Sequence, residues 1–273
     1  MSSLHSRQTA PRAYLPGSEA PRMALLTVGN PKVAKGRAKG YAVAVLHLAP
    51  HTLGGRNVCP AATPGCIASC LNLAGRGGLA PGAALTHAEV ATGARTNPIQ
   101  AARMRRTALL WGDRPAFAAA LLSDATRFAA WARANGWQPV LRLNGTSDLD
   151  FDAVLPGVVA ALRDLGVIRY DYTKVRNRMK RAAPDYSLTF SLAEGNDAQA
   201  ADWLRAGGRA AAVLRVRKGQ PLPATLTLDG QAFPVVDGDV DDLRFLDPEG
   251  VVVGLRAKGP AKRDRSGFVR DVH

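Results

Sequence analysis

The chain has 273 residues, of which 47% are hydrophobic and 21% charged, and it carries a formal net charge of +14 at pH 7. These values are typical of a globular protein with one large domain or two small ones, and no apolar run reaches the roughly 18 residues of a membrane-spanning helix. The positive charge favours an anionic partner, a nucleotide or a nucleic acid, although arginine enrichment that serves only solubility explains it equally well.

The N-terminal residues 1–22 are polar, basic and interrupted by proline, and they contain no apolar segment of the kind that a secretory signal needs. We expect a disordered basic tail over residues 1–22 and a single α/β domain over residues 23–273. The chain has three cysteines, an odd number, so any disulfide scheme would leave one thiol over. A reducing cytoplasm is therefore the expected location.

Apolar runs and helical patterns alternate along the rest of the chain. Short apolar runs predict buried strands, and capped segments with apolar residues at three- and four-residue spacing predict helices. This alternation favours an α/β fold, a partial (β/α) barrel with mostly parallel strands, and an open doubly wound sheet is the alternative. The predicted strands cover residues 41–50, 139–144, 167–172, 187–192, 210–216 and 251–257, and the predicted helices cover residues 64–73, 98–111, 113–136, 152–166 and 196–208.

All three cysteines of the chain fall in the segment NVCPAATPGCIASCLN, residues 57–72. A Thr-Pro pair within it is the pattern of a helix start, and it places Cys66 and Cys70 one turn apart on the same helix face. Cys59 lies in the preceding loop and can fold back over the helix N-terminus, where the helix dipole favours thiolates. The C-x6-C-x3-C spacing can therefore bring three thiolates to one centre.

Three thiolates suit more than one kind of centre. A 4Fe–4S cluster held by three cysteines would keep one iron open for substrate or cofactor, and we favour this interpretation. Structural zinc usually takes four ligands, so a zinc site would need His47 or His51 as the fourth. Three free thiols without a metal, acting as small core residues, are the remaining alternative.

Polar side chains follow three of the predicted strands, in the stretches RLNGTSD, YDYTK and SLAEGN. Ligands of parallel sheets bind beyond the carboxyl ends of the strands, so we expect these side chains to gather at one edge, together with the cysteines. Asp171 or Lys174 would act on the substrate, Lys174 by pairing with an anion or by serving as an acid or base. The expected pocket for a small polar cofactor consists of Asn144, Thr146, Asp148, Ser191 and Glu194.

Each stretch also has a purely structural interpretation. RLNGTSD can be a tight turn in which Asp148 caps the next helix, Lys174 can be a solvated surface lysine, and SLAEGN can be a loop with Asn196 as a helix cap. A further acidic stretch, VDGDVDDLRFLD at residues 236–247, lacks the glycine and the final glutamate of a calcium loop. We predict instead that Arg244 pairs with one of its aspartates.

Several motifs, taken in order, resemble those of one known family. NVCPAATPGC with ASCLN, IQAARMRRT, RLNGTSD, YDYTK, LTFS, VVDGD with DLRFLD, and GLRAKG with SGFV are similar to the bacteriophage gene product 88 domain family. The resemblance extends from Leu25 to Val269. It implies a phage or prophage protein in the cytoplasm of a bacterium or an infected host, and it implies no particular chemistry.

A second and weaker resemblance is to the radical S-adenosylmethionine enzymes. Those enzymes combine a partial α/β barrel with three cysteines after the first strand, which hold a four-iron cluster whose open iron binds the cofactor. Cys59, Cys66 and Cys70 also follow the first long predicted strand. Their spacing departs from the C-x3-C-x2-C that is usual in that superfamily, so S-adenosylmethionine binding rests on this resemblance alone.

Two functions follow from these observations. The first is an iron–sulfur enzyme, similar to the radical S-adenosylmethionine enzymes, that acts on an anionic nucleotide or nucleic-acid substrate in a phage context. The second is a zinc-stabilised nucleic-acid-binding protein without catalysis, whose affinity would fall steeply with added salt. Colour separates the two, because an iron–sulfur protein is brown and a zinc protein is colourless.

Overall fold

The structure is a computed structural model that describes residues 14–29 and 34–272. Within these residues, ten strands form one sheet in the order β1-β2-β3-β4-β5-β6-β9-β8-β7, and β10 pairs with β6 outside this path. From β2 through β6 and β9 to β8 all neighbours are parallel, whereas β1 and β7 run antiparallel to β2 and β8. The strands are β1 Leu26–Thr27, β2 Tyr41–Leu46, β3 Gln138–Arg142, β4 Ile168–Thr173, β5 Tyr186–Ser191, β6 Arg209–Leu214, β7 Thr225–Leu228, β8 Gln231–Asp237, β9 Val252–Arg256 and β10 Val269–Arg270.

The helices start at the residues that favour a helix N-terminus. Thr63, Asn97 and Asp113 each accept a first-turn backbone N–H through the side chain, and proline follows within two residues. The α-helices are α2 Pro64–Ala68, α3 His87–Thr92, α4 Pro98–Gly112, α5 Arg114–Ala134, α6 Phe151–Val154, α7 Pro156–Asp164 and α8 Asp197–Arg205. The 3-10 helices are η1 Lys35–Lys39, η2 Leu71–Leu73, η3 Gly75–Gly78, η4 Arg176–Arg181, η5 Arg244–Leu246 and η6 Gly259–Arg263.

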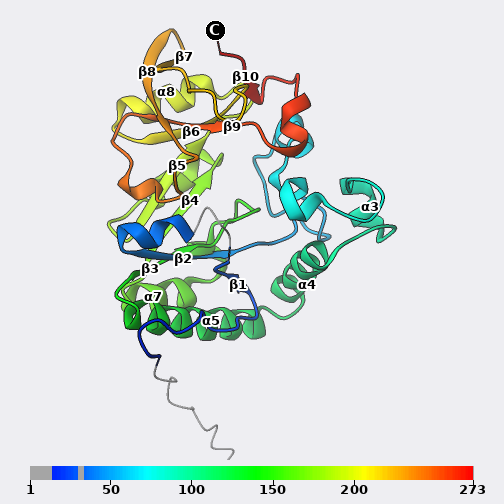
Figure 1. The fold of residues 1–273 in the computed structure, drawn as a ribbon, viewed down its shortest axis with the longest axis vertical. Helices are drawn as coiled ribbons and strands as arrows, with labels where there is room; N and C mark the ends of the chain where they lie inside the picture. Colours follow the sequence, from blue (N-terminus) through cyan, green and yellow to red (C-terminus); the bar gives the residue numbers. More distant parts are fainter. Residues whose placement is uncertain (1–13, 30–33, 273) are drawn as a thin grey trace, which may run out of the picture.

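Three connecting helices pack on the same face of the sheet. Ala44, Leu141 and Tyr186 belong to one row of register partners that runs across β2, β3, β4 and β5, so their side chains share a face. Leu141 belongs to the core that includes α5 and α7, and Tyr186 to the core that includes α8. Figure 1 shows α5 and α7 along the lower end of the sheet and α8 near its upper end.

The opposite face is covered by η1 and by the segment that contains η5. Leu243, from that segment, packs with Val43 of β2 and Val140 of β3. Asp242 accepts the hydroxyl of Tyr170, a residue of β4, at 2.7 Å. This face of the sheet is therefore closed by residues 238–248, with both apolar and ionic contacts.

The structure confirms the α/β class and the mostly parallel sheet, whereas the sheet is not closed into a barrel. Within the described residues β1 and β7 are the two open edges of the path. The strand order follows the chain from β1 to β6, so the central reversal of a doubly wound sheet is not found there. The predicted pairing of Arg244 is confirmed, since it lies 3.2 Å from both Asp241 and Asp247.

Several predicted elements differ in extent from the observed ones. The strand expected over residues 41–50 ends at Leu46, and the helix expected over residues 64–73 divides into α2 and η2. The helix expected over residues 152–166 divides into α6 and α7 at Pro156, because proline has no backbone N–H to continue the helix. The hairpin of β7 and β8, the helix α3, and the short strands β1 and β10 were not predicted, and β9 is not the last strand.

Residues 14–22 lie along α5. The N–H of Gly17 donates to Asn135 Oδ1 at 2.7 Å, and the carbonyl of Ser18 accepts Trp131 Nε1 at 2.8 Å. The tail boundary expected at residue 22 therefore falls inside a segment that packs on α5, and residues 1–13 of the expected tail lie outside the described residues. In the described part of the chain, no helix combines the length and apolar character that crossing a bilayer requires.

Candidate functional site

The stretch RLNGTSD forms a turn beyond the carboxyl end of β3. Asn144 is its centre, because its Oδ1 accepts the Leu149 N–H and the Ser147 hydroxyl, each at 2.8 Å. Its Nδ2 donates to the Leu149 carbonyl at 3.0 Å. Gly145 is required next to it, since a Cβ there would lie 2.6 Å from Val45 Cγ1. The polar side chains of this stretch therefore stabilise the turn itself.

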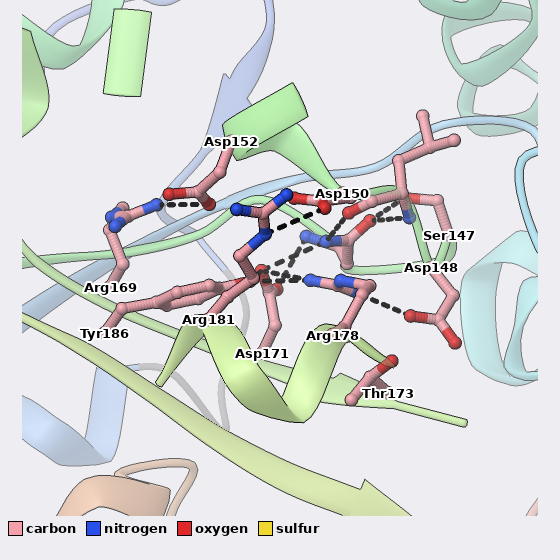
Figure 2. A network of polar contacts seen from close by, with 12 residues as sticks. Ser147, Asp148, Asp150, Asp152, Arg169, Asp171, Thr173, Arg178, Arg181 and Tyr186 are labelled. Carbon is pink, nitrogen blue, oxygen red and sulfur yellow. Dashed lines mark hydrogen bonds and ion pairs between the residues drawn. The ribbon is translucent and has the colours of Figure 1, made fainter. Parts of the chain in front are cut away.

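A buried ionic network lies beneath this turn (Figure 2). Asp171 accepts the Asn144 N–H at 2.8 Å and the Tyr186 hydroxyl at 3.0 Å, and Arg178 Nη2 lies 3.8 Å from it. Arg178 also donates to Tyr186 Oη at 2.6 Å and to Asp148. Burial raises the pKa of Asp171, while Arg178 and Asn144 act in the opposite direction. Asp171 is 2% exposed, so its carboxylate serves the network and holds β4 to the turn after β3.

Lys174 follows β4 at the same edge of the sheet. Its N–H donates to Asp148 Oδ2 at 2.8 Å, which directs Asp148 toward η4 and away from the cap position of the next helix. The Lys174 ammonium lies 5.7 Å from the centre of the Phe268 ring. Phe268 belongs to the small apolar cluster against which Cys66 packs. The lysine side chain therefore extends toward the segment that contains the cysteines.

Glu194 fixes the N-terminus of α2 to the carboxyl end of β5. Its Oε1 accepts the Gly65 N–H at 2.6 Å, and its Oε2 accepts the Thr63 hydroxyl. Thr63 in turn caps α2 by accepting the Cys66 N–H at 3.2 Å. Burial alone would raise the pKa of Glu194, but hydrogen bonds from Thr63, Gly65 and Ser266 lower it, so the carboxylate is ionised at neutral pH. The helix that contains Cys66 is thus tied to the sheet by one carboxylate.

Cys59 lies beside the turn that follows β3. Its Sγ accepts the His51 N–H at 3.3 Å and lies 3.8 Å from the Thr146 carbonyl oxygen. The Thr146 hydroxyl donates to the Leu48 carbonyl at 2.6 Å, which joins this turn to the chain leaving β2. Burial raises the pKa of Cys59 to about 12, and the hydrogen bond from His51 only partly opposes it. In the metal-free protein Cys59 is therefore a protonated thiol.

The other two thiols lie close enough to Cys59 to act on it electrostatically. Negative charge on Cys70 or Cys66 raises the pKa of Cys59. Burial raises the pKa of Cys70 to about 11, whereas the charges of Arg103 and Lys174 lower it. One cation from α4 and one from the end of β4 therefore stand beside the thiols. Figure 1 shows this cyan part of the chain beside the sheet, with the red η6 next to it.

Among the described residues, no group of three or more His, Cys, Asp or Glu side chains is placed so that it could hold a metal ion. The three cysteines are partly exposed free thiols. Their chemistry nevertheless suits a thiolate centre, because backbone N–H groups point at the sulfurs of Cys59 and Cys70 and two cations are near.

His47, directly after β2, shares the cationic surroundings of the thiols. Burial lowers its pKa to about 3, and Arg103 and Arg142 lower it further. The imidazole is therefore neutral at pH 7. Because the ordinary value is 6.5, the unfolded chain binds a proton between pH 6.5 and about 3 that the folded chain does not, and stability is lost as the pH falls through this window.

We predict a measurable difference between the metal-free wild-type protein and a His47→Gln variant in acid. The free energy of unfolding of the wild-type protein should fall more steeply with decreasing pH, by up to about 1.4 kcal/mol per pH unit. Urea denaturation in steps from about pH 7 down to about pH 4 measures both slopes. Parallel slopes for the two proteins would show that His47 does not titrate as described.

A cavity of about 360 Å³ lies beside the ionic network. Pro60, next to Cys59, lines it together with Asp148, Arg178 and other residues of η4. Of the five residues expected to line a cofactor pocket, only Asp148 lines this cavity. The other four are placed nearby but serve the turns, and they are Asn144, Thr146, Ser191 and Glu194.

The structure brings most of the predicted residues to one edge of the sheet, as the strand-end rule suggests, but it gives many of them partners within the protein. Sequence reasoning missed Arg178 and the role of Arg103, which donates to the carbonyl of Asn72 at 3.0 Å behind Cys70. It also missed the basic run RVRKG, residues 215–219, directly after β6. The same strand-end rule would have found that run.

The fold and the site together define an α/β protein with an open, mostly parallel sheet and a three-cysteine segment at the carboxyl edge of that sheet. A family model described as gene product 88 matches residues 24–272. The chain belongs to the gene product 88 family, which confirms the first resemblance. Neither the search of curated proteins nor the search of solved structures returned a match, so the resemblance to radical S-adenosylmethionine enzymes gains no support from them.

Proposed function

We propose that this protein is a phage-encoded, cytoplasmic enzyme in which Cys59, Cys66 and Cys70 hold an iron–sulfur cluster. The main support is that all three cysteines belong to one segment, and that this segment lies at the carboxyl edge of the sheet. Thr146 ties them to the end of β3, and Glu194 ties them to the end of β5. Enzymes with parallel sheets place their reacting groups at this edge.

The strand order also supports the proposal. From β2 to β6 the order follows the chain, and the connecting helices α5, α7 and α8 lie on one face. We propose that this part of the sheet is a partial barrel, open between its first and last strands. A site at its carboxyl edge would be reached from solvent without passing through the helical layer.

When bound, a cluster with three thiolate ligands would supply an open iron for a small polar cofactor such as S-adenosylmethionine. The chain's own residues would then support it in defined ways. The charges of Arg103 and Lys174 would offset the negative charge of the thiolates, as they do for Cys70. Lys174 would in addition pair with an anionic substrate, and Asp171 would position the turn rather than contact the substrate.

Anaerobic reconstitution with iron and sulfide tests the proposal. We expect the wild-type protein to become brown, with a broad absorption band near ~400 nm and with bound iron and sulfide. A Cys66→Ala variant should stay colourless, because two thiolates remain. A Ser69→Ala variant is the matched control, since it changes a buried polar residue of the same segment without removing a thiol, and it should hold the cluster.

Two results would overturn the proposal. A Cys66→Ala variant with full iron content would show that Cys66 is no ligand. Bound zinc without colour in the wild-type protein would favour the alternative, a zinc-stabilised nucleic-acid-binding protein without catalysis. That alternative is supported by the net charge of +14 and would need a fourth ligand such as His47 or His51.

A further inference from the structure

A larger cavity, of about 1180 Å³, lies at the carboxyl ends of β6, β9 and β8. Among its described lining residues, seven are lysine or arginine, one is aspartate and none is aromatic. The uncharged lining residues are Val216, Gly219, Gln220, Pro221 and Ala257, so no large apolar side chain lines the cavity and we call it the basic cleft. The basic residues are Lys35, Arg215, Arg217, Lys218, Arg256, Lys258 and Lys262.

Asp237 and Asp239 neutralise only part of this charge, and Arg256 Nη1 lies 2.9 Å from Asp237. Asp239 lies 2.6 Å from the Lys258 ammonium and 3.3 Å from Arg256 Nη1. Arg217, Lys218 and Lys262 are exposed and have no carboxylate partner among the described residues. Like charges gathered in a concave site repel one another and raise the local concentration of anions, so the cleft is suited to a polyanionic ligand.

Arg215 is a further cation in the wall of the basic cleft. Its Nε pairs with Asp271 and its Nη2 donates to the Asp264 carbonyl at 2.8 Å, so the guanidinium is held in place. Its Nη1 is buried and has no hydrogen-bond partner among the described atoms. The guanidinium therefore contributes a fixed positive charge to the wall of the basic cleft.

The basic cleft adjoins the cysteine segment. Lys262 belongs to η6, and η6 packs against η2, which begins directly after Cys70. A Cβ on Gly259, at the start of η6, would lie 3.2 Å from the Cα of Ala74. The basic cleft and the cysteine segment therefore share η6 as a common neighbour.

We propose that the basic cleft binds the sugar–phosphate backbone of a nucleic-acid strand and leads it to the cysteine segment. Several separated cations suit a ligand with repeated phosphates, and contacts to phosphates carry no sequence information. The lack of aromatic side chains means that bases are not stacked here, so the affinity comes from the phosphates. A concave site without large apolar side chains does not suit insertion into a membrane. This inference specifies the substrate class of the proposed function, and it relies on that function only for the link to the cysteines.

Fluorescence anisotropy with labelled single-stranded oligo-dT, oligo-dA and oligo-U tests the inference in the purified full chain. We expect similar affinities for the three and a steep weakening with salt. A triple variant, Arg217→Glu, Lys218→Glu and Lys262→Glu, should bind at least about tenfold more weakly at low salt. Its slope of log affinity against log salt should be lower by about 2, since each phosphate contact on a single strand contributes about 0.7.

A control variant with the same change in net charge separates the basic cleft from general electrostatics. Arg133→Glu, Arg163→Glu and Arg205→Glu change exposed residues near the ends of α5, α7 and α8, at the amino edge of the sheet, and should leave binding within about twofold of wild type. Equal weakening in both triple variants would overturn the assignment. So would binding to phosphatidylserine vesicles without binding to any oligonucleotide.

Iron content, measured in parallel, keeps the two proposals apart. Loss of oligonucleotide binding in the cleft variant with unchanged iron would support the cleft and leave the metal centre intact. Absence of oligonucleotide binding in an iron-loaded wild-type protein would overturn only the cleft. Binding that depends on the cleft, in a protein that takes up no iron, would support the cleft and overturn only the metal centre.

Discussion

An Arg178→Met variant should have a free energy of unfolding about 3–5 kcal/mol lower than that of the wild-type protein. Arg178 is 3% exposed and is the cation between Asp148 and Asp171, and it also donates to the Tyr186 hydroxyl. Methionine fills a similar volume but leaves the buried Asp171 without its positive partner. Two strand ends and the turn after β3 depend on this arrangement, so the loss affects the centre of the fold.

Arg181→Met is the matched control for this prediction. Arg181 comes from the same 3-10 helix and lies 3.1 Å from Asp150, but its side chain is 49% exposed (Figure 2). Exposed ion pairs contribute little to stability, so the free energy of unfolding of this variant should be less than about 1 kcal/mol below that of the wild-type protein. Urea denaturation of the three proteins compares them directly. Similar losses of unfolding free energy in both variants would mean that burial does not determine how much the ion pairs of Arg178 stabilise the protein.

Much of the fold could be predicted from the sequence, because several central elements are apolar and the helix starts are marked by capping residues followed by proline. The buried strands β2 and β6 are short apolar runs, and α4 and α5 have Asn97 and Asp113 as N-caps, each with proline close behind. The β7–β8 hairpin was missed because most of its residues are exposed, which leaves no apolar pattern to detect. Strand order was not predictable in full, since β9 enters between β6 and β8 through long-range pairing.

The position of the candidate site could be predicted, but the partners of its residues could not. The strand-end rule correctly placed the RLNGTSD and SLAEGN stretches beside the cysteines. It could not show that Asn144 and Glu194 are used by the protein itself, because their partners Asp171 and Gly65 are distant in sequence. A short polar side chain at a strand end serves a turn as readily as a ligand, and only the three-dimensional contacts distinguish the two.

A Glu194→Ala variant should bind its metal about 10- to 100-fold more weakly than the wild-type protein, if the cysteines hold a cluster as proposed. Glu194 contacts no sulfur but holds the Gly65 N–H and the Thr63 hydroxyl, and Thr63 caps the helix that contains Cys66. Without the carboxylate, two donors lose their acceptor and α2 is no longer tied to β5. The free energy of unfolding should fall by only about 1–3 kcal/mol, which leaves the metal-free protein folded.

A Glu89→Ala variant is the control, because it removes the cap of another helix and leaves the connection between α2 and β5 intact. Glu89 completes the capping box of α3 with Thr86, so its removal costs a comparable set of hydrogen bonds away from the end of β5. After anaerobic reconstitution, iron retention against a competing chelator should fall for Glu194→Ala and stay at the wild-type level for Glu89→Ala. Unchanged retention in Glu194→Ala would mean that the cysteine segment holds its metal without support from the sheet. Equal losses in both variants would point to general loosening of the fold, because Glu194 holds the helix that contains Cys66 to the end of β5 and Glu89 does not.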